Sequence, residues 1–396
     1  MSNSEDSSFD ALQEGPALKR HFHCRCGKPV YFRNSLCVHC GTPLGFDPSS
    51  GDLVPLALGA QPNTWVRWQA VPQPSAGPVW RRCGNFTTAA ACNWLIPADP
   101  RAMPPGPDGL PLAHRRLCPA CSVNRVIPDV DDPVRAQQWA KIELAKRQLF
   151  SALMAMGLPV ASKVDEDPQH GVAFDFLADV SGAPRILTGH DDGQITLNIA
   201  EADDALREQI RVAMHEPYRT VLGHLRHEIG HYYWDRLVDG TPWLEDFRTL
   251  FGDERADYAQ ALQAHYRDGP APDWPLGYIS AYAASHPWED WAETWAHYLH
   301  MVDTVSTAMG FGVQLQETDL VWDVFGPSAL YRPEVADAEA FLDRINNWVR
   351  LTGVLNELSR SMGMPDFYPF VMSVAVVRKL QFVHLVVQGA GARRDG

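Results

Sequence analysis

The chain contains two histidines four residues apart, in the run His227-Glu228-Ile229-Gly230-His231. On a helix this spacing puts both imidazoles on one face, one turn apart, where they can bind a single zinc ion. The carboxylate of Glu228 then lies beside the metal and can act as a base toward water there. The run therefore predicts a hydrolytic zinc site, and the competing interpretation is an ordinary core helix.

A catalytic zinc site needs a third protein ligand and keeps its fourth position for water. Two later segments offer that ligand. Asp253 stands just downstream of the histidines, whereas Glu289 and Glu293 lie one turn apart on a predicted helix that begins at Pro287. We favour Glu289 as the ligand and Glu293 as the hydrogen-bond partner of a ligating histidine. The alternatives are ligation by Asp253, or a solvated acidic face that carries both glutamates.

The reaction that fits these residues is hydrolysis of a peptide bond. Glu228 would accept the proton of the attacking water and return it to the leaving amine. A hydrogen-bond donor would assist the metal at the oxyanion, and Tyr282 or Tyr278 could supply it, with His286 as a weaker candidate. Either tyrosine could instead be a packing residue of the core.

All eight cysteines lie between Cys24 and Cys121, and their short spacings are those of zinc knuckles. They form two sets of four: Cys24, Cys26, Cys37 and Cys40, then Cys83, Cys92, Cys118 and Cys121. Four thiolates make a closed structural zinc site. We therefore expect two structural zinc ions in addition to one catalytic zinc ion.

Composition and pattern divide the chain into four parts. Residues 1–19 are predicted to be a disordered tail, and residues 20–128 a zinc-ribbon module with both four-cysteine sites. Residues 129–160 are predicted to be a linker helix, centred on an amphipathic run from Asp132 to Met156. Residues 161–396 are predicted to form the domain that carries the histidines.

The histidines belong to a predicted helix that Pro217 opens and Asp239-Gly240 closes. Its apolar stripe faces the core and consists of Leu222, Leu225, Ile229 and Tyr232. His224, one turn before His227, is expected to support the site or the structure rather than to bind zinc.

Alternating runs upstream of this helix predict a small, mainly antiparallel sheet. The runs are 172–177, 185–187 and 194–199, with Asp191-Asp192-Gly193 as a turn. We expect the run 194–199 to be an edge strand. Such an edge either pairs with an extended peptide substrate or is an ordinary protected edge.

The 396 residues carry a net charge of −14, with 45% hydrophobic and 21% charged residues, as in ordinary folded proteins. No stretch is apolar enough to cross a membrane, and the amino terminus lacks the apolar core of a secretory signal. We therefore expect a cytoplasmic protein. Residues 20–128 hold eleven Lys or Arg and four Asp or Glu. Eight thiolates with two zinc ions would remove most of that excess, so binding of nucleic acid is not predicted.

The segment from Tyr282 to Glu293 is similar to the Glu-x-aromatic-Ala-Glu helix of lethal-factor-type toxins, which belong to the gluzincin clan of metallopeptidases. In those proteins the first glutamate binds zinc and a preceding tyrosine assists the oxyanion. The resemblance implies that Glu289 is the ligand and that Tyr282 is the donor. Glu289 follows His231 at a much greater distance than in thermolysin-like enzymes, which keeps Asp253 as the alternative.

The layout of residues 20–388 resembles a bacterial family of zinc-binding metallopeptidases with an amino-terminal zinc ribbon. The stretches that carry the resemblance include Cys83-Gly-Asn85, 91–94, 225–234 and 286–297. It implies an α+β fold: a mainly helical zincin-like metallopeptidase domain with a small antiparallel sheet, preceded by the zinc-ribbon module. It also implies a zinc-dependent peptidase whose ribbon positions a protein substrate or partner.

Two other functions remain open at this point. One is a non-catalytic zinc-binding adaptor, in which both parts of the chain recognise another protein. The other, which is weaker, is binding of nucleic acid through the ribbon. The adaptor predicts that no peptide is hydrolysed, and strongly salt-dependent retention on DNA or RNA would favour binding of nucleic acid.

Overall fold

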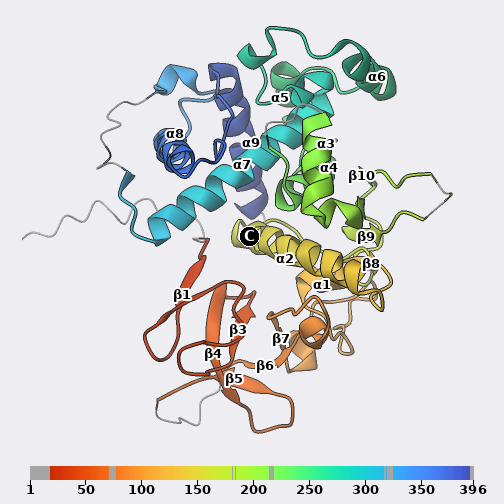
Figure 1. The fold of residues 1–396 in the computed structure, drawn as a ribbon, viewed down its shortest axis with the longest axis vertical. Helices are drawn as coiled ribbons and strands as arrows, with labels where there is room; N and C mark the ends of the chain where they lie inside the picture. Colours follow the sequence, from red (N-terminus) through yellow and green to blue (C-terminus); the bar gives the residue numbers. More distant parts are fainter. Residues whose placement is uncertain are drawn as a thin grey trace, which may run out of the picture.

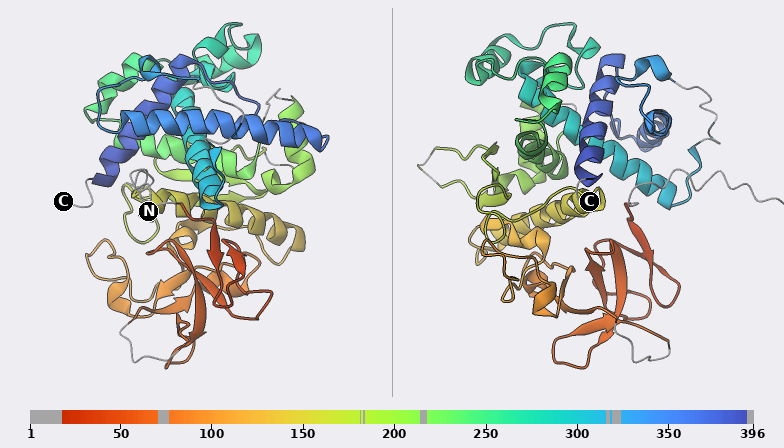
Figure 2. Two further views of the ribbon diagram at one scale, coloured as in Figure 1. Left: turned by 90° about the vertical axis from the view of Figure 1, so that its left-hand side faces the viewer. Right: turned by 180° about the vertical axis from the view of Figure 1, so that it is seen from behind.

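The computed structural model describes residues 18–70, 77–180, 182, 184–213, 218–315, 318 and 324–392. Strands gather at the amino-terminal end of the molecule and helices at the other end, with helix α2 lying across the boundary between them (Figure 1). Views from the side and from behind show the same division (Figure 2). The predicted tail falls almost entirely outside the described residues, except that Leu18 is described and buried.

The amino-terminal part is built from two antiparallel sheets. One has two strands, β1 and β2, and the other has five strands in the order β3-β4-β5-β6-β7. The strands are β1 His21–His23, β2 Pro29–Tyr31, β3 Leu44–Asp47, β4 Asp52–Leu58, β5 Trp65–Arg67, β6 Val79–Arg82 and β7 Leu95–Pro97. Several of these strands have only three residues. Their buried apolar side chains, such as Phe46, Leu53 and Trp80, form the core of this part.

The second part contains a four-stranded sheet in the order β10-β11-β9-β8. Its strands are β8 Asn124–Val126, β9 Ala173–Leu177, β10 Gly189–Asp191 and β11 Gln194–Asn198. Only β10 and β11 are antiparallel, since β9 runs parallel to both β11 and β8. The prediction of a mainly antiparallel sheet was therefore wrong. Strand β8 comes from residues assigned to the ribbon, and a pairing so distant in sequence leaves no local signal.

The predicted edge strand was also wrong. Residues 194–198 form β11, which lies between β10 and β9, and the two edges of the sheet are β10 and β8. The predicted strand at 185–187 is instead irregular, and the strand begins at Gly189. The turn itself is present, since Asp192 and Gly193 both have positive φ, at 42° and 75°. This tight turn folds the short strand β10 back onto β11.

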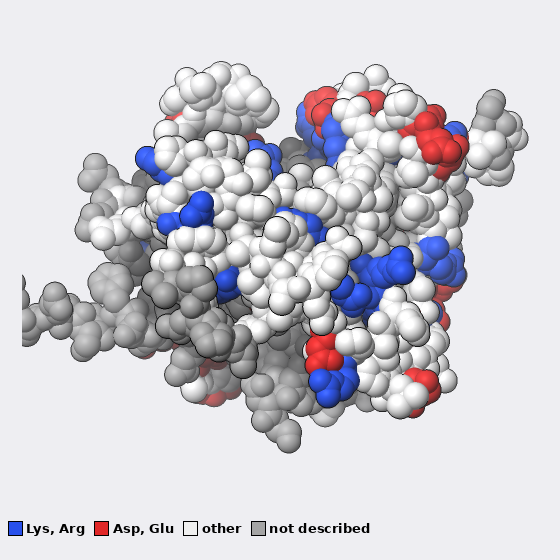
Figure 3. Space-filling view, turned by 90° about the horizontal axis from the view of Figure 1, so that it is seen from below, with Lys and Arg blue, Asp and Glu red and all other residues white. Residues whose placement is uncertain are grey.

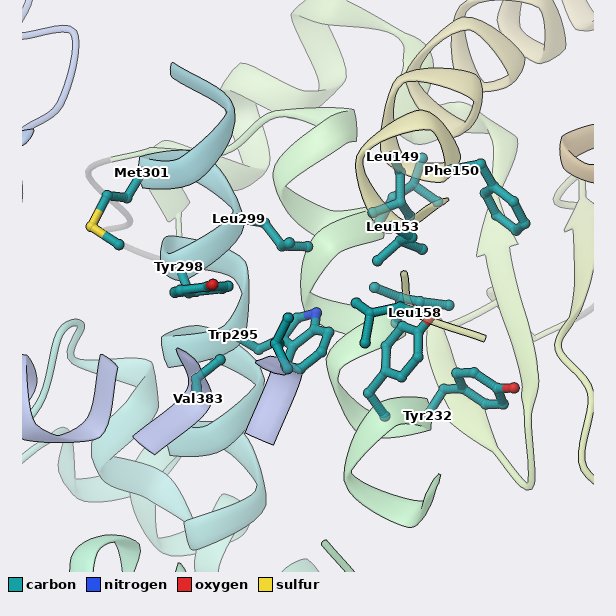
Figure 4. Close-up of a cluster of buried hydrophobic side chains, with 14 of the residues drawn as sticks. Leu149, Phe150, Leu153, Leu158, Tyr232, Trp295, Tyr298, Leu299, Met301 and Val383 are labelled. Atoms are coloured by element: carbon teal, nitrogen blue, oxygen red, sulfur yellow. The ribbon is translucent and has the colours of Figure 1, made fainter. Parts of the chain in front are cut away.

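The helix expected over residues 132–156 is α2, Pro133–Ala155. It begins at a proline, and the side chain of Asp132 accepts hydrogen bonds from the first turn. The helix is buried on several sides because it packs against α4 and against the short helix η4, Ile199–Ala202. Figure 4 shows Leu149 and Leu153 of α2 turned toward side chains of the other helices, whereas Phe150 points toward the sheet, where its ring is centred 6.0 Å from that of Phe174 on β9. The apolar residues of α2 are thus part of the main core, so the helix does more than link two domains.

The remaining helices form the body around α4 and α7. They are α3 Asp204–Ala213, α4 Val221–Leu237, α5 Trp243–Phe251, α6 Tyr258–Asp268, α7 Pro287–Gly310, α8 Ala338–Ser361 and α9 Val374–Ala392, with α1 Pro119–Ser122 before β8. The helix with the two histidines is α4. Thr220 caps its amino-terminal end, so the helix begins later in the sequence than predicted. Pro217, the predicted opening residue, lies outside the described residues.

Buried ion pairs connect the start of the chain to the helical body. Asp303 on α7 accepts hydrogen bonds from Arg20 at 2.7 Å and from Arg226 at 2.5 Å. Arg20 also donates to the hydroxyl of Ser151 on α2 at 2.6 Å. One carboxylate is thus paired with cations from two distant segments, which satisfies charges that would be costly to bury alone.

Helices α4 and α7 approach each other closely at Gly230. A Cβ at this position would lie 3.1 Å from Cα of Ala292 and 3.2 Å from Cβ of Trp295. The indole of Trp291 donates a hydrogen bond of 2.8 Å to the carbonyl of Gly230. The glycine therefore sets the spacing of the two helices that carry the predicted metal ligands.

We expect Gly230→Ala to separate α4 from α7, because backbone atoms and a fixed Cβ cannot move aside. Overpacking of this kind costs about 1–3 kcal/mol. Thermal unfolding and competition with a zinc chelator would measure the loss of stability and of metal affinity. Gly277→Ala is the control, since a Cβ at that position would have no atom within 4 Å. Equal behaviour of the two variants would contradict the role of Gly230.

Candidate metal centre

The side chains of His227, His231 and Glu289 converge on one point between α4 and α7. Their ligand atoms lie within 4.8 Å of one another. Oε2 of Glu289 is 3.0 Å from Nε2 of His227 and 3.7 Å from Nε2 of His231. Helical spacing aligns the two imidazoles, and α7 supplies the carboxylate from the opposite side.

The donor set fits a zinc ion. Glu289 is 1% exposed, and its Oε2 has no hydrogen-bond partner among the described residues. A buried, unpaired carboxylate oxygen is costly, and a cation facing it removes the cost. Two imidazoles and one carboxylate are the protein ligands of a catalytic zinc site, which leaves one position open.

A second layer of contacts orients the ligands. Nδ1 of His227 donates to Oε1 of Glu293 at 2.7 Å, and Ser280 donates to the other oxygen of Glu293 at 2.6 Å. This leaves the lone pair of Nε2 of His227 for the metal. Glu293 thus occupies the position predicted for it, beside a ligand and one helical turn from Glu289.

Tyr258 is a site residue that the sequence analysis missed. Its hydroxyl donates a hydrogen bond of 2.6 Å to Oε1 of Glu289. It is the first residue of α6, directly after the capping residue Asp257. The local sequence therefore indicates only a helix start, and the contact depends on how α6 packs over the site.

The predicted oxyanion donors lie in different surroundings. The ring of Tyr282, on the short helix η6 Tyr282–Ser285, is centred 5.9 Å from the ring of His227. Tyr278 instead carries the ammonium of Lys379 over its ring at 4.3 Å. His286 caps α7, where its Nδ1 accepts from the amide of Trp288 at 3.1 Å. Of the three candidates, Tyr282 is the one whose ring neighbours the histidines.

Asp253, the alternative ligand, does not join the convergent group. Its side chain is 55% exposed and forms a two-point ion pair with Arg255, with distances of 2.8 Å. Among the described residues, the carboxylate that meets both histidines is that of Glu289.

The first four-cysteine set is assembled by tight turns next to β1 and β2. The sulfur atoms of Cys24, Cys26, Cys37 and Cys40 lie within 4.8 Å of one another. Gly27 and Gly41, which follow the two knuckles, have φ of 77° and 69°, a conformation that favours glycine. Both Cys26 and Cys40 are at least partly accessible.

The second set, Cys83, Cys92, Cys118 and Cys121, also converges within 4.8 Å, but all four residues are buried. Helix α2 covers it with charged side chains. Glu143, which is fully buried, lies 3.7 Å from the sulfur of Cys121 and accepts from Lys146 at 2.7 Å. Asn124 of β8 donates to the same carboxylate at 2.8 Å. This centre therefore lies between the amino-terminal part, α2 and the four-stranded sheet of the body.

Basic and acidic side chains are interspersed on the face of the amino-terminal part. Figure 3 shows Lys and Arg there in several separate groups, with Asp and Glu beside some of them. No helix among the described residues is long and apolar enough to span a lipid bilayer.

Comparison with known proteins places this chain in a family. Residues 135–386 match the family described as "Putative zinc-binding metallo-peptidase", and residues 21–132 match a zinc-ribbon domain. The chain belongs to that metallopeptidase family.

Similar proteins occur in mycobacteria. Proteins of Mycobacterium tuberculosis strain H37Rv, of its strain CDC 1551 and of Mycobacterium bovis are each 40% identical to this chain over 370 residues. The matches cover 93% of this chain and 95% of each relative, and the relatives are named only as uncharacterized proteins. No solved structure matches the chain significantly.

Proposed function

We propose that this protein is a zinc-dependent metallopeptidase with a zincin-like catalytic domain. The observation that carries the proposal is the convergence of His227, His231 and the unpaired oxygen of Glu289. Membership of the metallopeptidase family supports it. Glu228 stands next to the first ligand and is buried, as a base at a water-excluding site must be.

The residues divide the chemistry among them. Zinc, when bound, lowers the pKa of water and polarises the carbonyl that is attacked. Glu228 removes the proton from the attacking water and passes it to the leaving amine. Burial, together with the nearby charge of Glu289, raises the pKa of Tyr282. Its phenol therefore stays protonated at neutral pH and can donate to the oxyanion.

The substrate we propose is an extended peptide that pairs with the edge strand β10. This strand packs against α4, and the ring of His190 on β10 is centred 6.2 Å from that of His231. A peptide added to the outer edge of β10 would pass beside the metal ligands. Main-chain hydrogen bonds would hold it in register there.

The amino-terminal part would position the protein substrate or a partner. Its two four-cysteine centres would each hold a structural zinc ion, which gives three zinc ions per chain. Cysteines grouped as metal ligands rather than joined as disulfides are typical of a reducing compartment, which favours the cytoplasm.

Zinc counting tests the proposal together with hydrolysis of an unfolded protein such as casein. We expect three zinc ions in the wild-type chain and two in a His227→Ala, His231→Ala variant, which should also lose hydrolysis. Replacing the cysteines should remove the other two ions. A wild-type chain that binds only two zinc ions would contradict a catalytic metal centre.

A further inference from the structure

A third imidazole on α4, besides the two proposed metal ligands, contacts the proposed base. Nε2 of His224 lies 3.2 Å from Oε1 of Glu228, one helical turn away. Nδ1 of the same ring lies 2.5 Å from Oε2 of Glu201. Both nitrogens therefore face carboxylate oxygens, and a hydrogen bond to each requires a proton on both.

Glu201 is fixed in the body independently of α4. It belongs to η4, directly after β11, and it is buried. Its Oε1 accepts a hydrogen bond of 2.5 Å from the hydroxyl of Thr188, and Arg219 lies 3.6 Å from Oε2. A carboxylate held by these groups provides a rigid support for the ring of His224.

The charges of Glu201, His224 and Glu228 stabilise one another. Burial lowers the pKa of His224, but the charges of Glu201 and Glu228 and the hydrogen bonds to both together outweigh burial and raise the pKa to about 9. Burial raises the pKa of Glu201, yet the charge of His224 and its hydrogen bond lower that pKa to about 2. A cation between two carboxylates is the arrangement that makes a buried set of ions tolerable.

A glutamate that acts as a base has to be oriented, because its side chain rotates about three bonds and misplacement of about 1 Å costs catalysis. His224 contacts one carboxylate oxygen of Glu228 and leaves the other to accept the proton. The contact comes from the same helix as the ligands, so the base and the metal site are held in one frame.

We propose that His224, held in place by Glu201, is a positioning residue that orients the carboxylate of Glu228 toward the attacking water. This inference rests on the proposed peptidase function and names how its base is controlled. It also accounts for the buried pair of Glu201 and His224, neither of which belongs to the convergent group of proposed zinc ligands.

The first test compares His224→Leu, Glu201→Gln and the double variant in zinc-loaded protein. We expect kcat to fall about 10- to 100-fold in each single variant, the range typical of residues that orient a metal site. KM and zinc content should stay near the wild-type values, whereas the melting temperature should fall, because each single variant leaves a buried charge without its partner. The double variant should be no slower than His224→Leu alone, since both changes break one chain of contacts.

His224→Gln provides a conservative control. The amide of the new Gln can still donate to Glu228. It cannot donate to Glu201 at the same time, as the two opposite nitrogens of an imidazole can, so the kcat of this variant should lie between those of wild type and His224→Leu. Additive losses in the double variant, or a loss explained by lower zinc content, would assign His224 a purely structural role and overturn the proposal.

A second readout does not depend on turnover. With cobalt(II) in place of zinc at the histidine site, the visible spectrum reports the surroundings of the open coordination position. We expect His224→Leu and Glu228→Gln to change this spectrum in the same direction. If wild type hydrolyses nothing while the spectrum responds in this way, the peptidase function fails but the positioning role stands. A spectrum unchanged by His224→Leu would overturn the positioning role.

Discussion

Replacing Glu228 with Gln is expected to abolish hydrolysis while leaving the metal site intact. The amide is isosteric with the carboxylate but cannot accept the proton of the attacking water. Loss of a general base typically costs about 10²- to 10⁴-fold, and we expect about 10³-fold in kcat/KM for a peptide or casein substrate. Zinc analysis should still find three ions per chain, because Glu228 is outside the ligand set.

The same variant separates the peptidase from an adaptor. A protein that only binds partners would show no turnover in either form, and its partner binding would be the same with Gln at this position. Cleavage at the wild-type rate by Glu228→Gln protein would remove Glu228 from the mechanism. A melting temperature equal to that of wild type is the control that the substitution changes chemistry and not folding.

Loss of the second four-cysteine centre is expected to destabilise the whole body, whereas loss of the first is not. We expect Cys118→Ser with Cys121→Ser to lower the melting temperature by at least about 10 °C, because structural zinc sites contribute on the order of 10 kcal/mol to folding. The reason is the position of this centre, which touches Glu143 on α2 and lies three residues from β8.

The matched control is Cys24→Ser with Cys26→Ser in the first centre. That centre is more exposed, and the hydrogen bonds of its described knuckle residues join residues of the amino-terminal part. We expect this variant to lose one zinc ion while the histidine site keeps its own. Thermal unfolding followed by zinc release at each step would compare the two variants, and equal destabilisation would contradict a special role of the second centre.

Local spacing was enough to locate the candidate ligands. The four-residue interval between His227 and His231 requires only a helix to bring the imidazoles together, and the interval from Glu289 to Glu293 works in the same way. The cysteine knuckles likewise carry their geometry in a few residues. The division of the eight cysteines into two sets of four could therefore be predicted from the sequence alone.

Contacts between distant segments could not be predicted in this way. Tyr258 reaches Glu289 from the first turn of another helix, and Glu201 reaches His224 from a short helix after β11. Neither residue stands in a local pattern that differs from an ordinary helix end. The parallel pairing of β8 with β9 likewise joins two strands that are separated in the sequence by the whole of α2. This pairing is decided by burial in the shared core.

The positions of strand β8 and Arg20 imply that the two parts of this chain cannot be separated at the boundary between the family matches. The two family matches meet at residues 132 and 135, yet β8 and the arginine partner of Asp303 both lie on the amino-terminal side of that junction. A gene fragment cut there would encode a carboxy-terminal half in which β9 lacks its partner strand β8 and Asp303 lacks the guanidinium of Arg20. The two halves are therefore not independent units that could be exchanged between proteins. Expression trials should retain everything from Leu18 onward.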